Sequence, residues 1–170
     1  MLPKSYLAFK WIVYALATLL LCALQSFLFS HIRILTVTPF IYPIIPAIAA
    51  MYEGPRRGAV FALFFGLLCD LLLPAPFTGF FVILFPLIGL VSASIAGNMV
   101  SPGFFCALLV SSLGLSITGG TRVLLQLLSG GEHLTLWAWV ALTEALLSLP
   151  AMVVVHPLFR TIHRRCASDY

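Results

Sequence analysis

The chain has 170 residues, of which 62% are hydrophobic and only 8% are charged. Soluble domains carry about 25% charged residues, so this composition excludes a soluble globular protein. The chain is long enough for about six membrane spans of about 20 residues each. The residues left over are too few to form a second domain. We therefore expect a single integral membrane domain over residues 1–170.

Most charged residues lie at the chain ends or between long apolar runs, and they divide the sequence into spans. The runs predict an all-α, polytopic membrane protein with six transmembrane helices. The expected spans cover about 11–29, 34–51, 58–73, 77–96, 104–128 and 134–159. We expect the first to be a retained membrane helix rather than a cleaved signal peptide, because its apolar run lacks a good small-x-small cleavage site.

The basic residues indicate how the spans are oriented. With the N-terminus inside the cell, the cytoplasmic ends of the spans would hold Lys4, Lys10, Arg56, Arg57, Arg160, Arg164 and Arg165. An outer loop would hold Arg33, and this asymmetry follows the positive-inside rule. Both termini are therefore expected in the cytoplasm, and the net charge of +4 is explained without a nucleic-acid partner.

The first half of the second expected span is rich in proline. Pro39, Pro43 and Pro46 each lack a backbone N–H and push against the preceding turn, so we expect a kink near the outer face. The carbonyl groups freed by such a kink permit two outcomes, a packed irregular helix or a ligand pocket.

Small residues recur every four positions in the third and fourth expected spans. They are Gly58, Ala62 and Gly66, followed by Gly89, Ala93 and Gly97. Small residues at this spacing let two helix backbones approach closely, so this face predicts packing between the two helices or against a partner. Pro74 and Pro76 predict a short turn between them, which ends near Gly79.

Three ionisable residues, Asp70, Arg122 and Glu144, lie inside apolar runs. A charge at mid-bilayer costs at least about 2.5–3.5 kcal/mol, so it normally faces the interior of the bundle and has a partner. We expect an intramembrane polar network in which Asp70 pairs with Arg122 and Glu144 is protonated. A structural network is the first interpretation, and a proton relay, a cation site and a polar substrate pocket are the alternatives.

The sequence carries no phosphate-binding glycine loop and neither of the motifs HExxH and GxSxG. Its four histidines and four cysteines do not cluster at the spacing of metal ligands. We therefore expect a protein that is not an enzyme and has no catalytic residue, metal or cofactor, surrounded by lipid and protein partners.

Residues 58–79 resemble a known family. The run Gly66-Leu67-Leu68-Cys69-Asp70-Leu71, followed by a short turn and Gly79, resembles a pattern of the bacterial rod shape-determining protein MreD family. The proline-rich second span, the chain length and the short basic tail are similar too. Phe40 after Pro39, and Thr78 before Gly79, depart from the family's pattern.

The resemblance implies a fold similar to the small substrate-binding subunits of energy-coupling-factor transporters. It implies a subunit of the cell-elongation machinery in the bacterial inner membrane, which binds the bitopic protein MreC and other elongation proteins and helps couple MreB filaments to peptidoglycan synthesis. The alternative is a substrate-binding subunit of an energy-coupling-factor-type vitamin or metal-ion transporter. Very short expected outer loops at 30–33 and 74–79 favour the first function.

Overall fold

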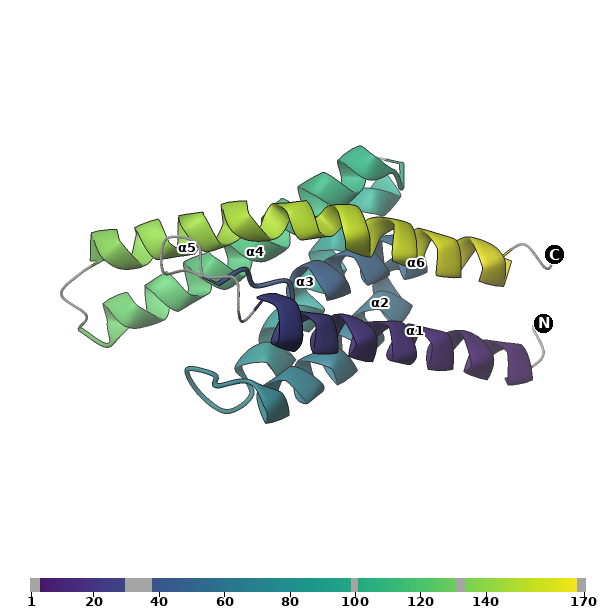
Figure 1. Ribbon diagram of the computed structural model, residues 1–170, viewed down its shortest axis with the longest axis horizontal. Helices are drawn as coiled ribbons and strands as arrows, with labels where there is room; N and C mark the ends of the chain where they lie inside the picture. Colours follow the sequence, from purple (N-terminus) through teal and green to yellow (C-terminus); the bar gives the residue numbers. More distant parts are fainter. Residues whose placement is uncertain (1–3, 30–37, 99–100, 131–133, 168–170) are drawn as a thin grey trace.

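The computed structural model describes residues 4–29, 38–98, 101–130 and 134–167, and within them the protein is all-helical with no strand (Figure 1). The helices are α1 (Lys4–Leu24), α2 (Ile44–Leu72), α3 (Phe80–Asn98), α4 (Phe104–Leu128), α5 (Leu134–Ser148) and α6 (Met152–Ala167). A π-helical turn, η1 (Gln25–Phe29), extends α1, and a 3-10 turn, η2 (Leu149–Ala151), joins α5 to α6.

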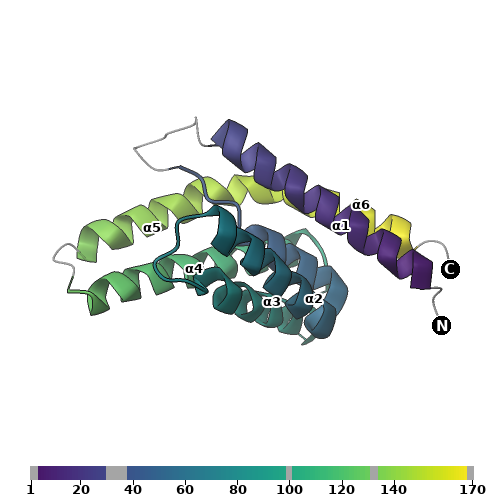
Figure 2. The ribbon, with the colours of Figure 1, turned by 90° about the horizontal axis from the view of Figure 1, so that it is seen from below.

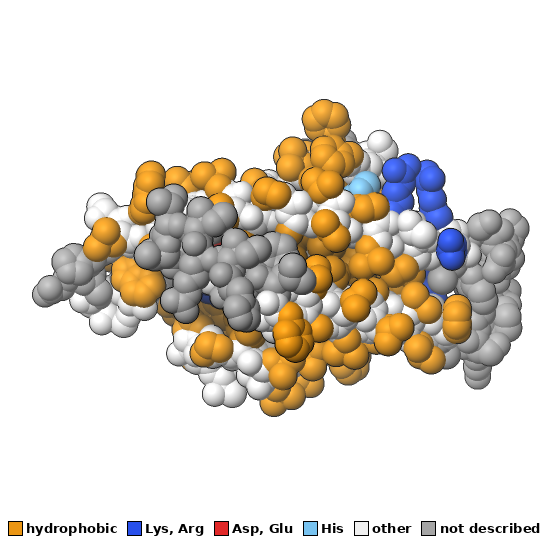
Figure 3. All heavy atoms as spheres, viewed as in Figure 1, with side chains coloured by type: hydrophobic (Ala, Val, Ile, Leu, Met, Phe, Trp, Pro, Cys, Tyr) orange, Lys and Arg blue, Asp and Glu red, His pale blue; other side chains and the backbone are white. Residues whose placement is uncertain are grey.

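Four helical segments of the described chain are long and apolar enough to cross a membrane. They are Phe9–Phe27, Phe80–Asn98, Phe104–Leu128 and Thr135–Arg165, the last of which combines α5, η2 and α6. Apolar side chains also cover much of the visible outer surface (Figure 3), which is the arrangement expected of a protein surrounded by lipid. An all-helical protein with several helices able to cross a membrane is thus confirmed, whereas the number of six spans stays a prediction.

The two termini lie at the same end of the molecule, and the C-terminal end of α4 and the N-terminal end of α5 lie at the other (Figure 1). Helices α1 and α6 run side by side along one flank, while α2, α3 and α4 form the packed centre (Figure 2). Lys and Arg side chains are visible near the end that carries the termini (Figure 3). The basic residues expected on one side of the membrane thus include several at this end.

The second and third expected spans meet in one broken helix, α2. Its backbone is non-helical at Gly54, where φ is 79° and ψ is 176°, and Pro55 follows. Glycine adopts a positive φ without steric penalty, so the break falls at this residue. The first arm, residues 44–53, is about 15 Å long, which is about half the thickness of a hydrocarbon core.

The structure corrects the expected course of the second span. Residues 34–37 lie outside the described chain, residues 38–41 are not helical, and every residue from 41 to 51 is buried. No helix is kinked at the three prolines, because Pro39 and Pro43 precede α2 and Pro46 lies in its first turn. Proline is well tolerated there, since the first N–H groups of a helix have no partner within the helix.

Aromatic side chains connect the elements of the core. Tyr14 of α1 packs edge-on against Phe159 of α6, with ring centroids 5.3 Å apart, and against Phe61 of α2 at 5.9 Å. Phe65 stacks on Phe85 of α3 at 5.4 Å. These contacts join the flank formed by α1 and α6 to the central helices.

Candidate functional site

Asp70, near the end of α2, holds the start of α3. Its carboxylate accepts hydrogen bonds from the backbone N–H groups of Phe81, at 3.0 Å, and Val82, at 3.2 Å. Both N–H groups belong to the first turn of α3, where a helix offers them no acceptor of its own. A negative charge at this position also interacts favourably with the helix dipole. Asp70 is therefore a cap supplied by the neighbouring helix.

Gly66 and Gly79 belong to the same hairpin. A Cβ atom on Gly66 would lie 2.5 Å from the carbonyl oxygen of Phe81, so only glycine permits this approach of α2 to α3. Gly79 has a φ of 91°, which allows the chain to turn into α3. The residues that carry the family resemblance thus form one structural unit.

The other small residues of α2 and α3 extend this packing face, except at one end. A Cβ on Gly58 would lie 2.6 Å from Ala50 in the first arm of α2, and one on Gly89 would lie 3.2 Å from the Cβ of Ala62. Gly97 has open space around its Cβ position and lies outside the packed face. The buried small residues of the face are Gly58, Ala62, Gly66, Gly89 and Ala93.

Arg122 of α4 pairs with Glu144 of α5 and not, as expected, with Asp70. The Arg122 Nη1 to Glu144 Oε1 distance is 3.1 Å. The guanidinium carbon lies 4.3 Å from the centre of the Phe40 ring, which adds a cation–π contact. Helices α4 and α5 are neighbours, whereas the carboxylate of Asp70 is directed to α3, so the three residues form two separate polar sites.

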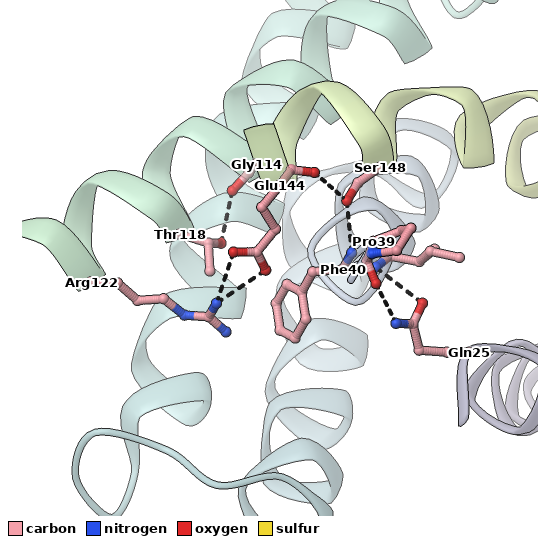
Figure 4. Close-up of polar contacts among 9 residues, drawn as sticks. Gln25, Pro39, Phe40, Gly114, Thr118, Arg122, Glu144 and Ser148 are labelled. Carbon is pink, nitrogen blue, oxygen red and sulfur yellow. Dashed lines mark hydrogen bonds and ion pairs between the residues drawn. The ribbon is translucent and has the colours of Figure 1, made fainter. Parts of the chain in front are cut away.

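The non-helical segment before α2 is held by side chains from two other elements (Figure 4). Gln25 donates from Nε2 to the carbonyl oxygen of Pro39 and accepts the N–H of Ile41 on its Oε1. Ser148 accepts the N–H of Phe40 at 2.7 Å. Buried backbone N–H and C=O groups outside a helix require such partners, because they have none within a helix of their own.

Sequence reasoning missed Gln25 and Ser148. The signal that could have found them is a lone polar side chain within an apolar run, which normally has a partner inside the bundle. Which backbone groups they meet depends on the path of the chain between α1 and α2, and local sequence does not determine that path.

A cavity of about 710 Å³ opens beside the Arg122–Glu144 pair. It lies between the α4–α5 hairpin and the turn after α2, and its apolar lining includes Phe77, Phe81 and Val140. The volume is within the range of about 300–1,000 Å³ typical of small-ligand sites. Phe40 contributes to its lining, but Pro39, Pro43 and Pro46 do not, so this cavity is not the pocket expected at a proline kink.

A second polar cluster, also missed from the sequence, surrounds Glu53 at the break in α2. Its carboxylate, with a side chain only 3% exposed, lies 2.6 Å from Lys10 Nζ of α1 and 3.2 Å from His163 Nδ1 of α6. The hydroxyl of Tyr14 donates to it at 2.8 Å. Burial by itself raises the pKa of Glu53, but the bonds from Lys10 and Tyr14 outweigh burial and hold that pKa below its ordinary value.

Neither the family models nor the curated proteins nor the solved structures contain a match to this chain. Among the described residues, no group of three or more His, Cys, Asp and Glu side chains is placed to hold a metal ion. Inference about function therefore rests on the hairpin, the ion pair and the cavity.

Proposed function

We propose that this chain is a non-enzymatic membrane subunit of the bacterial cell-elongation machinery, similar to the MreD family. The α2–α3 hairpin is the observation that carries the proposal. Gly66, Asp70 and Gly79 carry the resemblance, and each has a role that few residues can fill: close approach, capping and a positive φ. A resemblance built on such requirements is more specific than one built on shared hydrophobicity.

In this proposal the chain crosses the bacterial inner membrane six times, and both termini are cytoplasmic. The two arms of α2 take the second and third crossings, the first as a half-helix preceded by irregular backbone. The fold is similar to that of the substrate-binding subunits of energy-coupling-factor transporters. The common end of the two termini, and the basic side chains near it, support this orientation.

The proposed partner is an MreC-like bitopic protein, bound together with other elongation proteins. An apolar groove of about 600 Å³ between α1 and the second arm of α2 supports contact with a single membrane helix. Its walls include Ala15 and Leu19 on one side and Phe64 and Leu68 on the other. Residues at these spacings lie on one face of each helix, which is the geometry of helix-in-groove binding.

Affinity purification from gently solubilised membranes tests the proposal. We expect recovery of an MreC-like protein with the wild-type chain and reduced recovery with Ala15→Trp, which fills the groove. Leu20→Trp is the control, because Leu20 is exposed on another face of the same helix and does not line the groove. Failure to recover such a protein from a cell that makes one would contradict the proposal.

The second candidate is a substrate-binding subunit of an energy-coupling-factor-type transporter for a vitamin or metal ion. The cavity beside Arg122 and Glu144 favours it, because it has the volume of a ligand site. The same purification separates the two candidates. Recovery of cytoplasmic ATPase subunits in place of an MreC-like protein would establish the transporter function.

A further inference from the structure

The cavity at the α4–α5 hairpin combines two opposite charges with an apolar wall. Both Arg122 and Glu144 line it. The Arg122 side chain is 31% exposed, and the Glu144 side chain is 19% exposed. The pair is therefore not sealed inside the protein. A ligand in the cavity would meet a cation and an anion side by side, with Phe77 and Val140 close by.

Both charged groups have hydrogen-bonding capacity left for a ligand. A guanidinium has five N–H donors, and in the described structure only Nη1 of Arg122 contacts Glu144. The Phe40 ring covers the guanidinium without using its N–H groups. The Glu144 carboxylate has about four acceptor positions, and the side-chain bonds it receives from described residues come from Arg122.

The pair lies toward the end of α4 that is near the edge of the hydrocarbon core, within reach of lipid headgroups. Helix α4 has 25 residues and is therefore about 37 Å long, longer than a hydrocarbon core of about 30 Å. Arg122 lies about 9 Å from the C-terminal end of α4, close to the edge of the core. Trp137, which also lines the cavity, is a residue type enriched at this level of the membrane.

We propose that this cavity binds the headgroup of a zwitterionic phospholipid that carries a primary ammonium group, as phosphatidylethanolamine does. The phosphate would lie against Arg122, the ammonium against Glu144, and the adjoining apolar part of the lipid against Phe77 and Val140. This inference goes beyond the proposed function and does not rest on it.

Charge complementarity determines the choice of lipid. An ion pair is neutral as a whole and suits a headgroup that is neutral as a whole and carries both charges. An anionic headgroup would bring its phosphate to Arg122 but would offer no cation to Glu144. A trimethylammonium headgroup carries the cation but has no N–H to donate to a carboxylate.

Native mass spectrometry of the purified full chain tests the headgroup preference. The probes are phosphatidylethanolamine, phosphatidylglycerol and phosphatidylcholine with the same acyl chains. We expect phosphatidylethanolamine to bind about tenfold more tightly than the other two, as the loss of one charge-assisted hydrogen bond predicts. Equal binding of all three lipids, or tighter binding of phosphatidylglycerol, would overturn the proposal.

Variants test the location of the site. Arg122→Gln and Glu144→Gln should each weaken phosphatidylethanolamine binding about tenfold. Arg57→Gln, the control, removes an exposed charge far along the chain from the pair and should leave binding within about twofold of wild type. An equal loss in the control would place the lipid elsewhere and overturn the proposal.

A second pair of variants leaves the ion pair intact, in case its removal prevents folding. Val140→Trp fills the cavity and should abolish the lipid preference, whereas Leu142→Trp places the same side chain at an exposed position of α5 outside the cavity and should preserve it. A preference retained in Val140→Trp would refute binding in this cavity.

Discussion

The carboxylate of Asp70 accepts the backbone N–H of Phe81 at 3.0 Å, and so joins the end of α2 to the start of α3. Because the acceptor is charged and the donors belong to a helix start, this contact satisfies groups that lipid would leave without partners. It also gives Asp70 a local structural role that requires no ion pair with Arg122.

Removal of the Asp70 carboxylate should destabilise the hairpin. In Asp70→Ala the N–H groups of Phe81 and Val82 lose their acceptor, and we expect a loss of about 1–3 kcal/mol. Asp70→Asn keeps one acceptor oxygen and should lose less. Thermal unfolding of the purified variants in the same detergent measures the difference, and an unchanged midpoint in Asp70→Ala would refute the capping role.

Gly66 and Gly97 each belong to a series of small residues spaced by four, but substitution by alanine should change the stability of the protein differently at the two positions. Gly66→Ala places a Cβ 2.5 Å from the Phe81 carbonyl oxygen, and the forced separation of α2 and α3 should cost about 1–3 kcal/mol. Gly97→Ala meets open space in a helix and should be neutral or stabilising by up to about 1 kcal/mol. Unfolding midpoints compare the two, and equal effects would contradict the packing face described above.

A double-mutant cycle distinguishes the observed ion pair from the one expected from sequence. Alanine substitutions at Arg122 and Glu144 should show a coupling energy of about 0.6 kcal/mol, the average for such contacts between membrane helices, and at most about 1.7 kcal/mol. The cycle of Arg122 with Asp70 should give a value near zero, because the two residues belong to separate sites. Strong coupling in the second cycle would restore the pairing of Asp70 with Arg122.

Acid should remove the contribution of Glu53 to stability. Since the pKa of Glu53 is lower in the folded protein than its ordinary value of 4.5, the unfolded chain takes up the proton at higher pH. The stabilisation is therefore complete above about pH 4.5 and is lost as the pH falls through the lowered pKa. The measurement is the unfolding midpoint of wild type and Glu53→Gln over this range.

The two midpoints of that experiment should differ most near neutral pH and converge in acid. Lys10 and His163 are present in both proteins, so their own titration affects the difference only through Glu53. A difference that stays constant from pH 7 into acid would show that the cluster around Glu53 is not held by its charge.

Hydropathy predicted the all-helical class and the bounds of several helices. It could do so because the backbone N–H and C=O groups of a membrane helix bond to each other within the same segment. The fifth expected span, 104–128, has the bounds of α4, and the turn expected between 73 and 77 lies between α2 and α3. These features depend on run length and on the composition of short segments, which are visible in the sequence itself.

The course of the second span was predicted less well. The expected spans ended at 51 and resumed at 58, and the non-helical Gly54 lies between them, but the kink expected at Pro39, Pro43 and Pro46 is not present because the helix begins only at Ile44. Proline disturbs a helix only where preceding turns exist, and here the helix begins at the prolines, so their cost largely disappears. The buried position of residues 41–51 depends on helices that surround them from elsewhere in the chain.

By itself the sequence determined that this is a helical membrane protein and that Asp70, Arg122 and Glu144 need partners, because both conclusions follow from the cost of polar groups in lipid. Only the tertiary structure decided the partners: the start of α3 for Asp70, and Glu144 for Arg122. The physical reason is that several pairings satisfy the same charges at similar depth, and the packing of neighbouring helices determines which groups come within bonding distance.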